Sequence, residues 1–436
     1  MSSLKIGICG LGTVGSGVVN IFNAHHGLIQ QRCNNDLQLM HIGARRDNPD
    51  CDSSGYRVSR DIFEVVRDPE VDVVVELIGG TTVARDLVTQ AIEAGKHVVT
   101  ANKALIAEFG NELIALAEQA HVALRFEAAV AGGIPIIKVL RESLAANVVS
   151  GVVGIINGTG NFILTEMANA GRSFDDVLAE AQALGYAEAD PTFDIDGTDA
   201  AHKLVILASL AFAIPLDANA PVMEGIDTVT PEDLNFAKEL GFCVKHLGIA
   251  RRCGDAIDLR VHPTLIPTNR QIARVDGVLN AVMIEADAVG EIVLTGPGAG
   301  SLPTASSVCS DLMDLGKALN HSKVDPAPIL GVPSDQLQAL PLVPRHEVAG
   351  VWYLRLVVAD RPGVMAEITG LLSARGISIE QLIQRPPAEG SSHVTVVLLT
   401  DSIVCGHLDL AILDIESLPS LSGSVVRLRV ESFKEA

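Results

Sequence analysis

The stretch Leu4–Gly15, LKIGICGLGTVG, decides the fold of the amino-terminal region. Its short apolar run predicts a buried strand, and a Gly-x-Gly-x-x-Gly turn follows directly. Gly10 permits the tight turn, Gly12 lets a pyrophosphate approach the backbone, and Gly15 lets the next helix pack closely on the strand. A turn with only a structural role is the alternative. The residues expected to contact a dinucleotide here are Gly10, Gly12, Thr13, Val14 and Gly15.

Short apolar runs alternate with helical stretches from this motif to about Phe126. Because the apolar runs are continuous, the strands should be buried on both faces, and strand–helix–strand order predicts a Rossmann-type, doubly wound parallel sheet of α/β class over residues 1–133. The expected strands are 4–9, 37–44, 71–79, 96–101 and 122–128, with helices over 86–95 and 104–120.

The remaining chain predicts further domains. Residues 134–305 mix helical and β-rich runs, which indicates an α+β catalytic and dimerisation domain with its own sheet. Turn-rich TGPGAGSLPTASS precedes a helix near Val308–Leu319, and we expect residues 306–324 to return to the nucleotide domain. Residues 325–349 are proline-rich and predict a linker. The pattern of residues 350–436 is βαββαβ, a ferredoxin-like order.

Composition excludes several classes of partner and compartment. A net charge of −21, from 53 acidic and 32 basic residues, argues against nucleic acid and against an anionic membrane surface. No apolar run approaches the ~20 residues that span a bilayer, and the amino terminus lacks a secretion pattern. The seven cysteines never form CxxC, so we expect reduced thiols and a cytoplasmic protein.

Cofactor choice depends on the end of the second expected strand. It ends Gly43-Ala44-Arg45-Arg46, and the first acid is Asp47. An acid at this position usually holds the ribose of NAD, whereas an arginine can bind the 2′-phosphate of NADP. Arg45 and Arg46 therefore favour NADP. NAD is the alternative, in which case both arginines are simply solvated.

Lys103, in VVTANKALIA, follows the expected strand 96–101. Ligands of open α/β sheets bind outside the carboxyl ends of the strands, so Lys103 is placed to face the cofactor. The alternative is an exposed lysine in the first turn of a helix.

Five carboxylates fall within twelve residues, from Glu188 to Asp199. Asp199 and Lys203 are four residues apart, so a helix beginning near Thr198 would present both on one face. A lysine partly desolvated there could donate a proton. An ordinary surface ion pair is the alternative, and a calcium loop is disfavoured because the EF-hand pattern is missing.

The run GYAEADPTFDIDGTDAAHK (185–203) closely resembles the signature of the homoserine dehydrogenase family. INGTGNFIL (156–164) and TANKALIA (100–107) resemble that family too, in the same order, and the resemblance spans Ile6–Leu319. It implies reversible reduction of L-aspartate 4-semialdehyde to L-homoserine with NAD(P)H, in the biosynthesis of threonine, methionine and isoleucine.

The resemblance also implies roles for residues. Lys203 would donate the proton to the substrate carbonyl oxygen, and Lys103 would contact the nicotinamide end and polarise that oxygen. Glu188 and Asp199 would bind the amino acid, with Asp194 in support. Asn157, Gly158 and Thr159 would line the substrate pocket, and Gly185 and Gly300 would touch the cofactor.

The family further implies a sodium ion near a hinge. Its ligands would be Glu127, through its carboxylate or carbonyl, and the carbonyls of Val130, Gly132 and Ile134. The residues alone indicate only an ordinary interdomain hinge.

The run Asp360-Arg361-Pro362-Gly363-Val364, at the first expected strand–helix turn of this region, resembles the ACT domain, a small-molecule sensor, and the resemblance covers residues 351–431. The resemblance implies threonine as an effector near Asp360, Pro362 and Gly363. A purely structural dimerisation domain is the alternative. A homodimer or homotetramer is expected.

Two other functions compete. The first is a different Rossmann reductase of an amino-acid aldehyde, although a phosphorylating one would need a nucleophilic cysteine, and Cys243 and Cys253 lack that context. The second is a nucleotide- and amino-acid-sensing regulator. It would need a DNA-reading element or a partner surface; neither a helix-turn-helix candidate nor a basic helix is found, and the net charge of −21 is adverse to DNA binding.

Overall fold

The structure is a computed structural model that describes residues 3–33, 35–319, 328–387, 390–431 and 433. The last residues of the expected 306–324 segment and the first of the expected linker lie outside this described part. Contacts divide the chain into two compact units. The first unit comprises Met1–Gly158, Asp199–Pro221 and Val278–Leu340, and the second comprises Thr159–Thr198, Val222–Gly277 and Pro341–Ala436.

The first unit contains a six-stranded parallel sheet in the order β3-β2-β1-β4-β5-β6. The predicted doubly wound sheet is thereby confirmed. Its strands are β1 (Ser3–Cys9), β2 (Asp36–Gly43), β3 (Arg57–Ser59), β4 (Val73–Glu76), β5 (His97–Thr100) and β6 (Leu124–Arg125). Its helices are α1 (Thr13–Cys33), α2 (Phe63–Arg67), α3 (Thr82–Glu93) and α4 (Lys103–Gln119).

Two details of this sheet differ from expectation. The short strand β3 was not predicted, because three residues are too few to show a pattern. The expected strand 122–128 is a strand only at Leu124–Arg125, since a 3₁₀ turn covers Glu127–Ala129.

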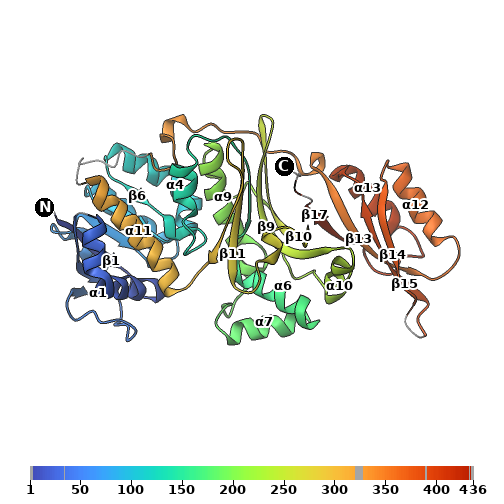
Figure 1. Ribbon diagram of the computed structural model, residues 1–436, viewed down its shortest axis with the longest axis horizontal. Helices are drawn as coiled ribbons and strands as arrows, with labels where there is room; N and C mark the ends of the chain where they lie inside the picture. The colour runs from blue at the N-terminus through green and yellow to red at the C-terminus, as the bar shows by residue number, and fades with distance from the viewer. Residues whose placement is uncertain (1–2, 34, 320–327, 388–389, 432, 434–436) are drawn as a thin grey trace. The chain divides into compact units, whose positions relative to one another are not determined.

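Helix α11 (Ser301–Leu319) packs beside α1, and both contribute apolar side chains to the core over β1 and β2 (Figure 1). The helix begins earlier than predicted, so the expectation that residues 301–307 form a turn was wrong. Pro303 lies in the first helical turn, where proline is tolerated because the N–H there has no intrahelical acceptor.

The first unit also carries a small antiparallel sheet and a buried helix. The sheet has the order β12-β11-β7, from β7 (Val149–Ile155), β11 (Leu279–Ala286) and β12 (Gly290–Pro297). Helix α9 (Thr198–Phe212) begins at the predicted residue and is buried along most of its length. Two short helical segments follow each other before β7: α5 (Ile136–Lys138) and a π-helical turn (Val139–Ser143).

The second unit is built on one sheet with the order β9-β10-β17-β13-β15-β14. Its strands are β8 (Val222–Met223), β9 (Phe242–Cys253), β10 (Ala256–Pro267), β13 (Ala349–Ala359), β14 (Ile379–Gln384), β15 (His393–Thr400), β16 (Ile403–Val404) and β17 (Val426–Val430). Its helices are α6 (Gly158–Ala170), α7 (Phe174–Ala183), α8 (Thr192–Ile195), α10 (Pro231–Glu239), α12 (Val364–Ala374) and α13 (Cys405–Glu416).

The predicted βαββαβ order is confirmed from β13 to β17, and β17 also pairs in parallel with β10. Because side chains alternate along a strand, the two faces of β13 enter different cores. Trp352 packs with the residues of α12 and α13, which lie together on one face of this sheet (Figure 1). Tyr353 packs with α6 and α10, and its hydroxyl donates to Asp233 at 2.9 Å.

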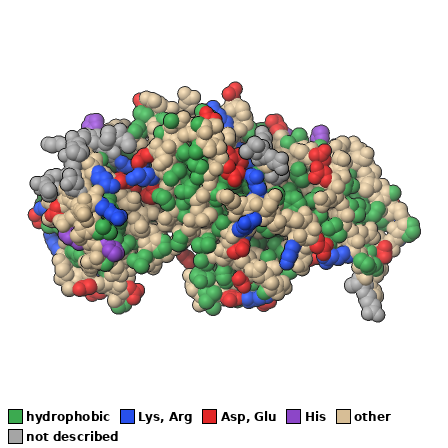
Figure 2. Space-filling view, in the orientation of Figure 1, with side chains coloured by type: hydrophobic (Ala, Val, Ile, Leu, Met, Phe, Trp, Pro, Cys, Tyr) green, Lys and Arg blue, Asp and Glu red, His purple; other side chains and the backbone are tan. Residues whose placement is uncertain are grey.

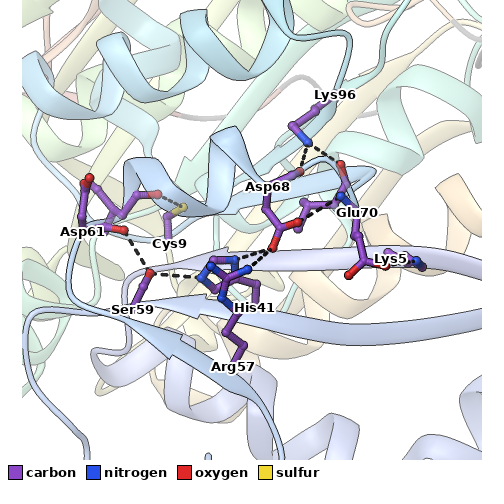
Figure 3. Close-up of polar contacts among 11 residues, drawn as sticks. Lys5, Cys9, His41, Arg57, Ser59, Asp61, Asp68, Glu70 and Lys96 are labelled. Carbon is purple, nitrogen blue, oxygen red and sulfur yellow. Dashed lines mark hydrogen bonds and ion pairs between the residues drawn. The ribbon is translucent and has the colours of Figure 1, made fainter.

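The edge of the parallel sheet is tied by a buried polar network (Figure 3). His41 Nδ1 lies 2.9 Å from Asp68 Oδ2, and His41 Nε2 lies 3.1 Å from the Ser59 hydroxyl. Lys96 Nζ donates to the Asp68 carbonyl at 2.6 Å. These residue types also occur in hydrolases, but both His41 and Ser59 are buried, and the Ser59 hydroxyl also bonds the Asp61 carbonyl at 3.1 Å. The network therefore joins strands.

On the face drawn in Figure 2, Lys and Arg side chains occur in small groups with Asp and Glu beside them.

All seven cysteines are free thiols. No helix in the described ranges combines the length and apolar composition needed to cross a membrane. Within the same ranges, no group of three or more His, Cys, Asp or Glu side chains could hold a metal ion.

Candidate active site

The glycine turn between β1 and α1 has the backbone that its sequence suggests. Gly10 has φ +107°, and a Cβ there would lie 2.6 Å from the Leu77 carbonyl oxygen. A Cβ on Gly15 would lie 2.1 Å from the Gly10 carbonyl oxygen. Both positions therefore require glycine, whereas Gly12 faces open space. The first N–H groups of a helix have no intrahelical acceptor, so the start of α1 at Thr13 suits an anion.

A cavity of about 720 Å³ opens beside this turn. Its walls come from three segments at the carboxyl ends of β1, β2 and β4, as expected for a ligand site in such a sheet. The lining residues are Gly10–Gly12, Gly43–Pro49, Ile62 and Leu77–Val83. This shape and position fit an elongated, phosphate-bearing molecule.

Charge at one end of the cavity is mixed. Arg45 and Arg46 line it and are exposed, and Asp47 lies beside them. Arg60 holds Asp47 with contacts of 2.8 and 3.0 Å to the two carboxylate oxygens. It also donates to the Ala44 carbonyl oxygen at 3.3 Å. Arg60 was missed in the sequence, because its place beside Asp47 depends on the unpredicted strand β3.

The start of α11 lies against the glycine turn. The Ser301 hydroxyl donates to the Thr13 carbonyl at 2.7 Å, and a Cβ on Gly17 would lie 2.6 Å from the Ser301 carbonyl oxygen. Gly300, with φ +120°, makes the turn that leads into this contact. Gly300 is therefore brought close to Thr13, although they are far apart in the sequence.

Lys103, Asn157, Asp199 and Lys203 meet in the first unit. Lys203 Nζ donates to Asp199 Oδ2 at 2.6 Å, and Asn157 Nδ2 donates to the same oxygen at 2.9 Å. Lys103 Nζ lies 3.2 Å from the other oxygen, Oδ1. Lys203 also donates to the Ile156 carbonyl at 2.7 Å. One carboxylate thus holds two ammonium groups that come from different helices.

Burial alone would raise the pKa of Asp199, which is 4% exposed. The charges of Lys203 and Lys103, with hydrogen bonds from Lys203 and Asn157, outweigh that effect and lower the pKa to about 2. Asp199 is therefore ionised throughout the physiological range. The side chain of Lys103 is 33% exposed and that of Lys203 is 12% exposed, so Lys103 is the more accessible of the two. Such a pair suits a developing negative charge on oxygen.

Glu76 is a further buried carboxylate near the cavity, and sequence reasoning did not single it out. It is the last residue of β4 and is fully buried. Burial raises its pKa, although hydrogen bonds from Thr100, Ile78, Gly79 and Asn102 act in the opposite direction. The available signal was a charged residue at the end of the apolar run VDVVVE.

The carboxylates of the 185–199 run other than Asp199 belong to the second unit. Glu188 is exposed, and its carbonyl accepts from Gln182 at 3.1 Å. Asp194 lies in the short helix α8. Gly185, with φ +75°, ends α7. Thr159, at the start of α6, donates to the Tyr186 carbonyl at 2.7 Å, which fixes the loop that carries Glu188.

The turn after β6 is buried and contains Glu127, Val130, Gly132 and Ile134. Both carboxylate oxygens of Glu127 already accept backbone N–H groups, of Ile137 at 2.9 Å and Lys138 at 2.8 Å. The Gly132 carbonyl accepts from Ser307 at 2.6 Å. Burial and the negative charge of Asp311 raise the pKa of Glu127. Each of these oxygens accepts a single hydrogen bond and keeps a second lone pair, so both the Glu127 carboxylate and the backbone carbonyls of the turn are suited to a cation.

In the ferredoxin-like region, Asp360, Pro362 and Gly363 form the exposed turn between β13 and α12. Gly363 has φ +95° and precedes the first residue of α12. A left-handed residue at this position favours glycine.

Comparison with known proteins assigns the family. Models described as "Homoserine dehydrogenase" and "Homoserine dehydrogenase, NAD binding domain" match residues 135–313 and 10–127. A homoserine dehydrogenase of Pseudomonas aeruginosa is 52% identical over 431 residues, which is 99% of each chain. The chain belongs to the homoserine dehydrogenase family. The resemblance inferred from the sequence is therefore confirmed, and the chain is an NAD(P)-dependent oxidoreductase acting on a CH–OH group.

Solved structures of homoserine dehydrogenases agree. The crystal structure of the Thiobacillus denitrificans enzyme matches with a TM-score of 0.93 and 48% identity over 99% of both chains. A hyperthermophilic archaeal homoserine dehydrogenase in complex with NADPH matches at a TM-score of 0.61 and 27% identity, over 72% of this chain and 97% of that one. A model described as "ACT domain" matches residues 352–418, which confirms that this region is an ACT domain.

Proposed function

We propose that the chain interconverts L-aspartate 4-semialdehyde and L-homoserine, a step in threonine, methionine and isoleucine biosynthesis. The observation that carries this proposal is the Lys103–Asp199–Lys203 cluster in a member of this family. Lys203 donates a proton to the substrate carbonyl oxygen during reduction. Lys103 lies beside it and stabilises the negative charge that develops on that oxygen, while Asp199 holds both ammonium groups in place.

The nucleotide is held by the turn that contains Gly10, Gly12 and Gly15. The open space over Gly12 and the N-terminus of α1, with Thr13 and Val14, accommodate the pyrophosphate. When bound, the nicotinamide group supplies or accepts the hydride. The chain positions the nicotinamide and the substrate next to each other, and Lys103 and Lys203 contribute positive charge. Gly300, next to the turn, and Gly185 complete the proposed cofactor contacts.

NADP is the proposed preferred form. Arg45 and Arg46 provide two guanidinium groups at the end of the cavity where a 2′-phosphate would lie, and Arg60 neutralises the neighbouring Asp47. An unpaired carboxylate at this position would repel the phosphate. The NADPH complex of the archaeal homoserine dehydrogenase is in accord with this preference.

The proposed residues for amino-acid recognition come from two segments, 157–159 and 188–199. We propose that Glu188 binds the substrate ammonium group and that Asp194 supports it. Asp199, whose carboxylate already accepts three donors, contributes mainly through the lysines. Asn157, Gly158 and Thr159 line the substrate pocket. Glu188→Gln should raise the KM for homoserine while NADPH binding stays unchanged.

A sodium ion is proposed at the turn after β6, bound by Glu127 through its carboxylate or carbonyl oxygen and by the carbonyl oxygens of Val130, Gly132 and Ile134. Ala131 and Gly132 both have positive φ, of 54° and 50°, which turns this segment sharply within the core. Thermal unfolding in sodium chloride, compared with choline chloride at equal ionic strength, tests the site. A selective rise in the unfolding temperature with sodium supports it, and equal temperatures contradict it.

The ACT domain is proposed to bind threonine near Asp360, Pro362 and Gly363, giving feedback inhibition in a cytoplasmic homodimer or homotetramer. The free thiols suit a reducing compartment. Asp360→Ala should relieve inhibition by threonine without changing the rate in its absence. Light scattering measures the assembly.

The deciding experiment is homoserine-dependent reduction of NADP and of NAD, followed by nicotinamide absorbance with and without threonine. Faster turnover with NADP supports the arginine argument, and inhibition by threonine supports the sensor assignment. A folded, sodium-supplied protein that uses homoserine with neither cofactor would overturn the proposed reaction.

A further inference from the structure

Glu76 lies where the parallel sheet meets two loops of the proposed site. It pairs with Cys9 of β1 on one side and with Thr100 of β5 on the other. Its carboxylate is fully buried, and burying an ionisable group is unfavourable unless its oxygens are well satisfied. An apolar residue would fill this position at lower cost. The carboxylate must therefore be understood through the groups that it binds.

One carboxylate oxygen holds a loop of the nucleotide cavity. Oε1 of Glu76 accepts the N–H groups of Ile78 at 2.8 Å and Gly79 at 3.1 Å. Ile78, Gly79 and Gly80 all line the cavity. Gly79 and Gly80 have positive φ, of 72° and 70°, so the loop has little secondary structure of its own to fix it. Glu76 supplies the acceptor that holds its first turn.

The other oxygen leads to the proposed catalytic lysine. Oε2 accepts the Thr100 hydroxyl at 2.5 Å, and the Thr100 Oγ1 accepts the Asn102 N–H at 3.0 Å. Asn102 caps α4 by accepting the Leu105 N–H at 3.1 Å. Lys103, the first residue of α4, follows directly. Oε2 therefore fixes the turn that positions Lys103.

Asn102 closes the network into a ring. Its Nδ2 donates to the Gly80 carbonyl at 2.6 Å, so the cavity loop and the turn before α4 are also joined directly. Glu76 contacts both sides of this ring. A glutamine could not replace it fully, because its amide has only one acceptor oxygen whereas both oxygens of Glu76 are used.

We propose that Glu76 is a positioning residue that couples the cofactor-binding loop 77–80 to Lys103. This inference rests on the proposed function of Lys103 and of the cavity. The two oxygens have separate roles, because Oε1 orders the loop that meets the nucleotide, whereas Oε2 orders the turn that carries the lysine. These roles can therefore be separated by mutation.

Glu76→Gln keeps one acceptor oxygen for the loop and places an amide NH2 donor where Oε2 accepts the Thr100 hydroxyl, so the hydrogen bond to Thr100 is lost or reversed. We expect kcat to fall about tenfold, because small misplacements of a catalytic group cost up to ~100-fold. The dissociation constant of NADPH, measured by fluorescence, should stay within about twofold of wild type. Glu76→Ala removes both oxygens and should weaken NADPH binding as well, by roughly tenfold, because the loop loses its acceptor.

Thr100→Val breaks the same link from the other end, and Thr100→Ser is the matched control that keeps the hydroxyl. Thr100→Val should reproduce the loss in kcat, and Thr100→Ser should restore it. The double variant Glu76→Gln/Thr100→Val should be no slower than the slower single variant, because both changes remove one link. If Glu76→Gln does not fold, the comparison of Thr100→Val with Thr100→Ser decides.

The proposal is overturned if Glu76→Gln and Thr100→Val keep wild-type kcat, if their effects multiply, or if Glu76→Ala binds NADPH normally. Failure of the proposed function has a different signature. Wild-type protein without homoserine activity, or Lys103→Ala with wild-type kcat, would refute the reaction or the lysine's role. NADPH binding by Glu76→Ala and Glu76→Gln would still test the contact with the loop.

Discussion

Asp199 and Glu76 are two buried carboxylates of the same unit, and their surroundings shift their pKa values in opposite directions. Burial opposes ionisation in both, but two lysines beside Asp199 lower its pKa to about 2. Glu76 meets hydroxyl, amide and backbone donors, and its pKa is raised. Hydrogen bonds from neutral groups thus fail to offset burial, whereas two nearby cations do so.

The difference indicates separate uses of a carboxylate. At Asp199 the negative charge itself is needed. Two ammonium groups repel each other, and the carboxylate between them holds both in place before substrate binds. At Glu76 the geometry of two acceptor oxygens is needed, and the charge is costly. Changing each residue to its amide preserves the shape but removes the charge and one of the two acceptor oxygens, so the same substitution tests both statements.

The largest effect is expected at Lys203. Lys203→Met removes the proposed proton donor and one of the two cations beside Asp199 while it keeps an unbranched apolar stem. We expect kcat to fall by about 10³, within the ~10²–10⁴ range of general acid–base catalysis. NADPH binding, measured by fluorescence, should be nearly unchanged. Turnover close to wild type would show that another group donates the proton.

Asp199→Asn should come second, with kcat lowered about 100-fold, as for loss of one preorganised electrostatic contact. The amide cannot hold both ammonium groups, so the lysines should separate. Family resemblance alone predicts instead a defect in amino-acid binding. Steady-state kinetics with homoserine separates the two: a fall in kcat supports the structural role, and a rise in KM at constant kcat supports substrate binding. Glu76→Gln is the matched control, with its smaller expected loss.

A smaller effect is expected where the charges are exposed. Arg45→Ala/Arg46→Ala should lower kcat/KM for NADP by about tenfold and leave NAD nearly unaffected, since exposed charge pairs contribute little. The measurement is the ratio of the two kcat/KM values at low and high salt. Added salt should narrow the difference between variant and wild type, because it screens exposed charges. The same NADP-to-NAD ratio in the variant and in wild type would refute the proposed role of Arg45 and Arg46 in binding the 2′-phosphate.

The two carboxylates also show how far the sequence could be interpreted. The four-residue spacing predicted that Asp199 and Lys203 share a helical face, because helix geometry is local. That Lys103 reaches the other Asp199 oxygen depends on packing between α4 and α9, which no spacing encodes. The acceptors at Glu76 were invisible for the same reason. Local rules likewise predicted the glycine turn but misplaced the start of α11, because Gly300 and Pro303 look like turn residues.

For the fold too, features set by local sequence could be predicted, and features set by contacts between distant segments could not. Alternation of strands and helices predicted the parallel sheet and the βαββαβ order, since both depend on local periodicity. The parallel pairing of β17 with β10 through Thr264 and Arg429 could not be predicted, because it joins strands from distant segments. Arg60 was missed for a related reason: its role depends on the three-residue strand β3.

The smallest effect expected is on the pH dependence of stability, and it distinguishes the two carboxylates by sign. Because the folded-state pKa of Glu76 is raised above 4.5, the folded state binds more protons, so wild-type stability falls as pH rises above 4.5 toward the folded-state pKa. Glu76→Gln lacks this loss, so its stability relative to wild type should increase as pH rises above 4.5.

Asp199→Asn should behave differently. The folded-state pKa of about 2 lies below the ordinary 3.8, so this carboxylate stabilises the protein above pH 3.8 and loses that contribution only as pH falls toward 2. The loss of stability of Asp199→Asn relative to wild type should therefore be constant from about pH 5 to pH 8. Urea midpoints of both variants and wild type across this range provide the measurement. Parallel slopes for Glu76→Gln and wild type would mean that Glu76 is already ionised at the lower limit, and that its neutral donors do offset burial.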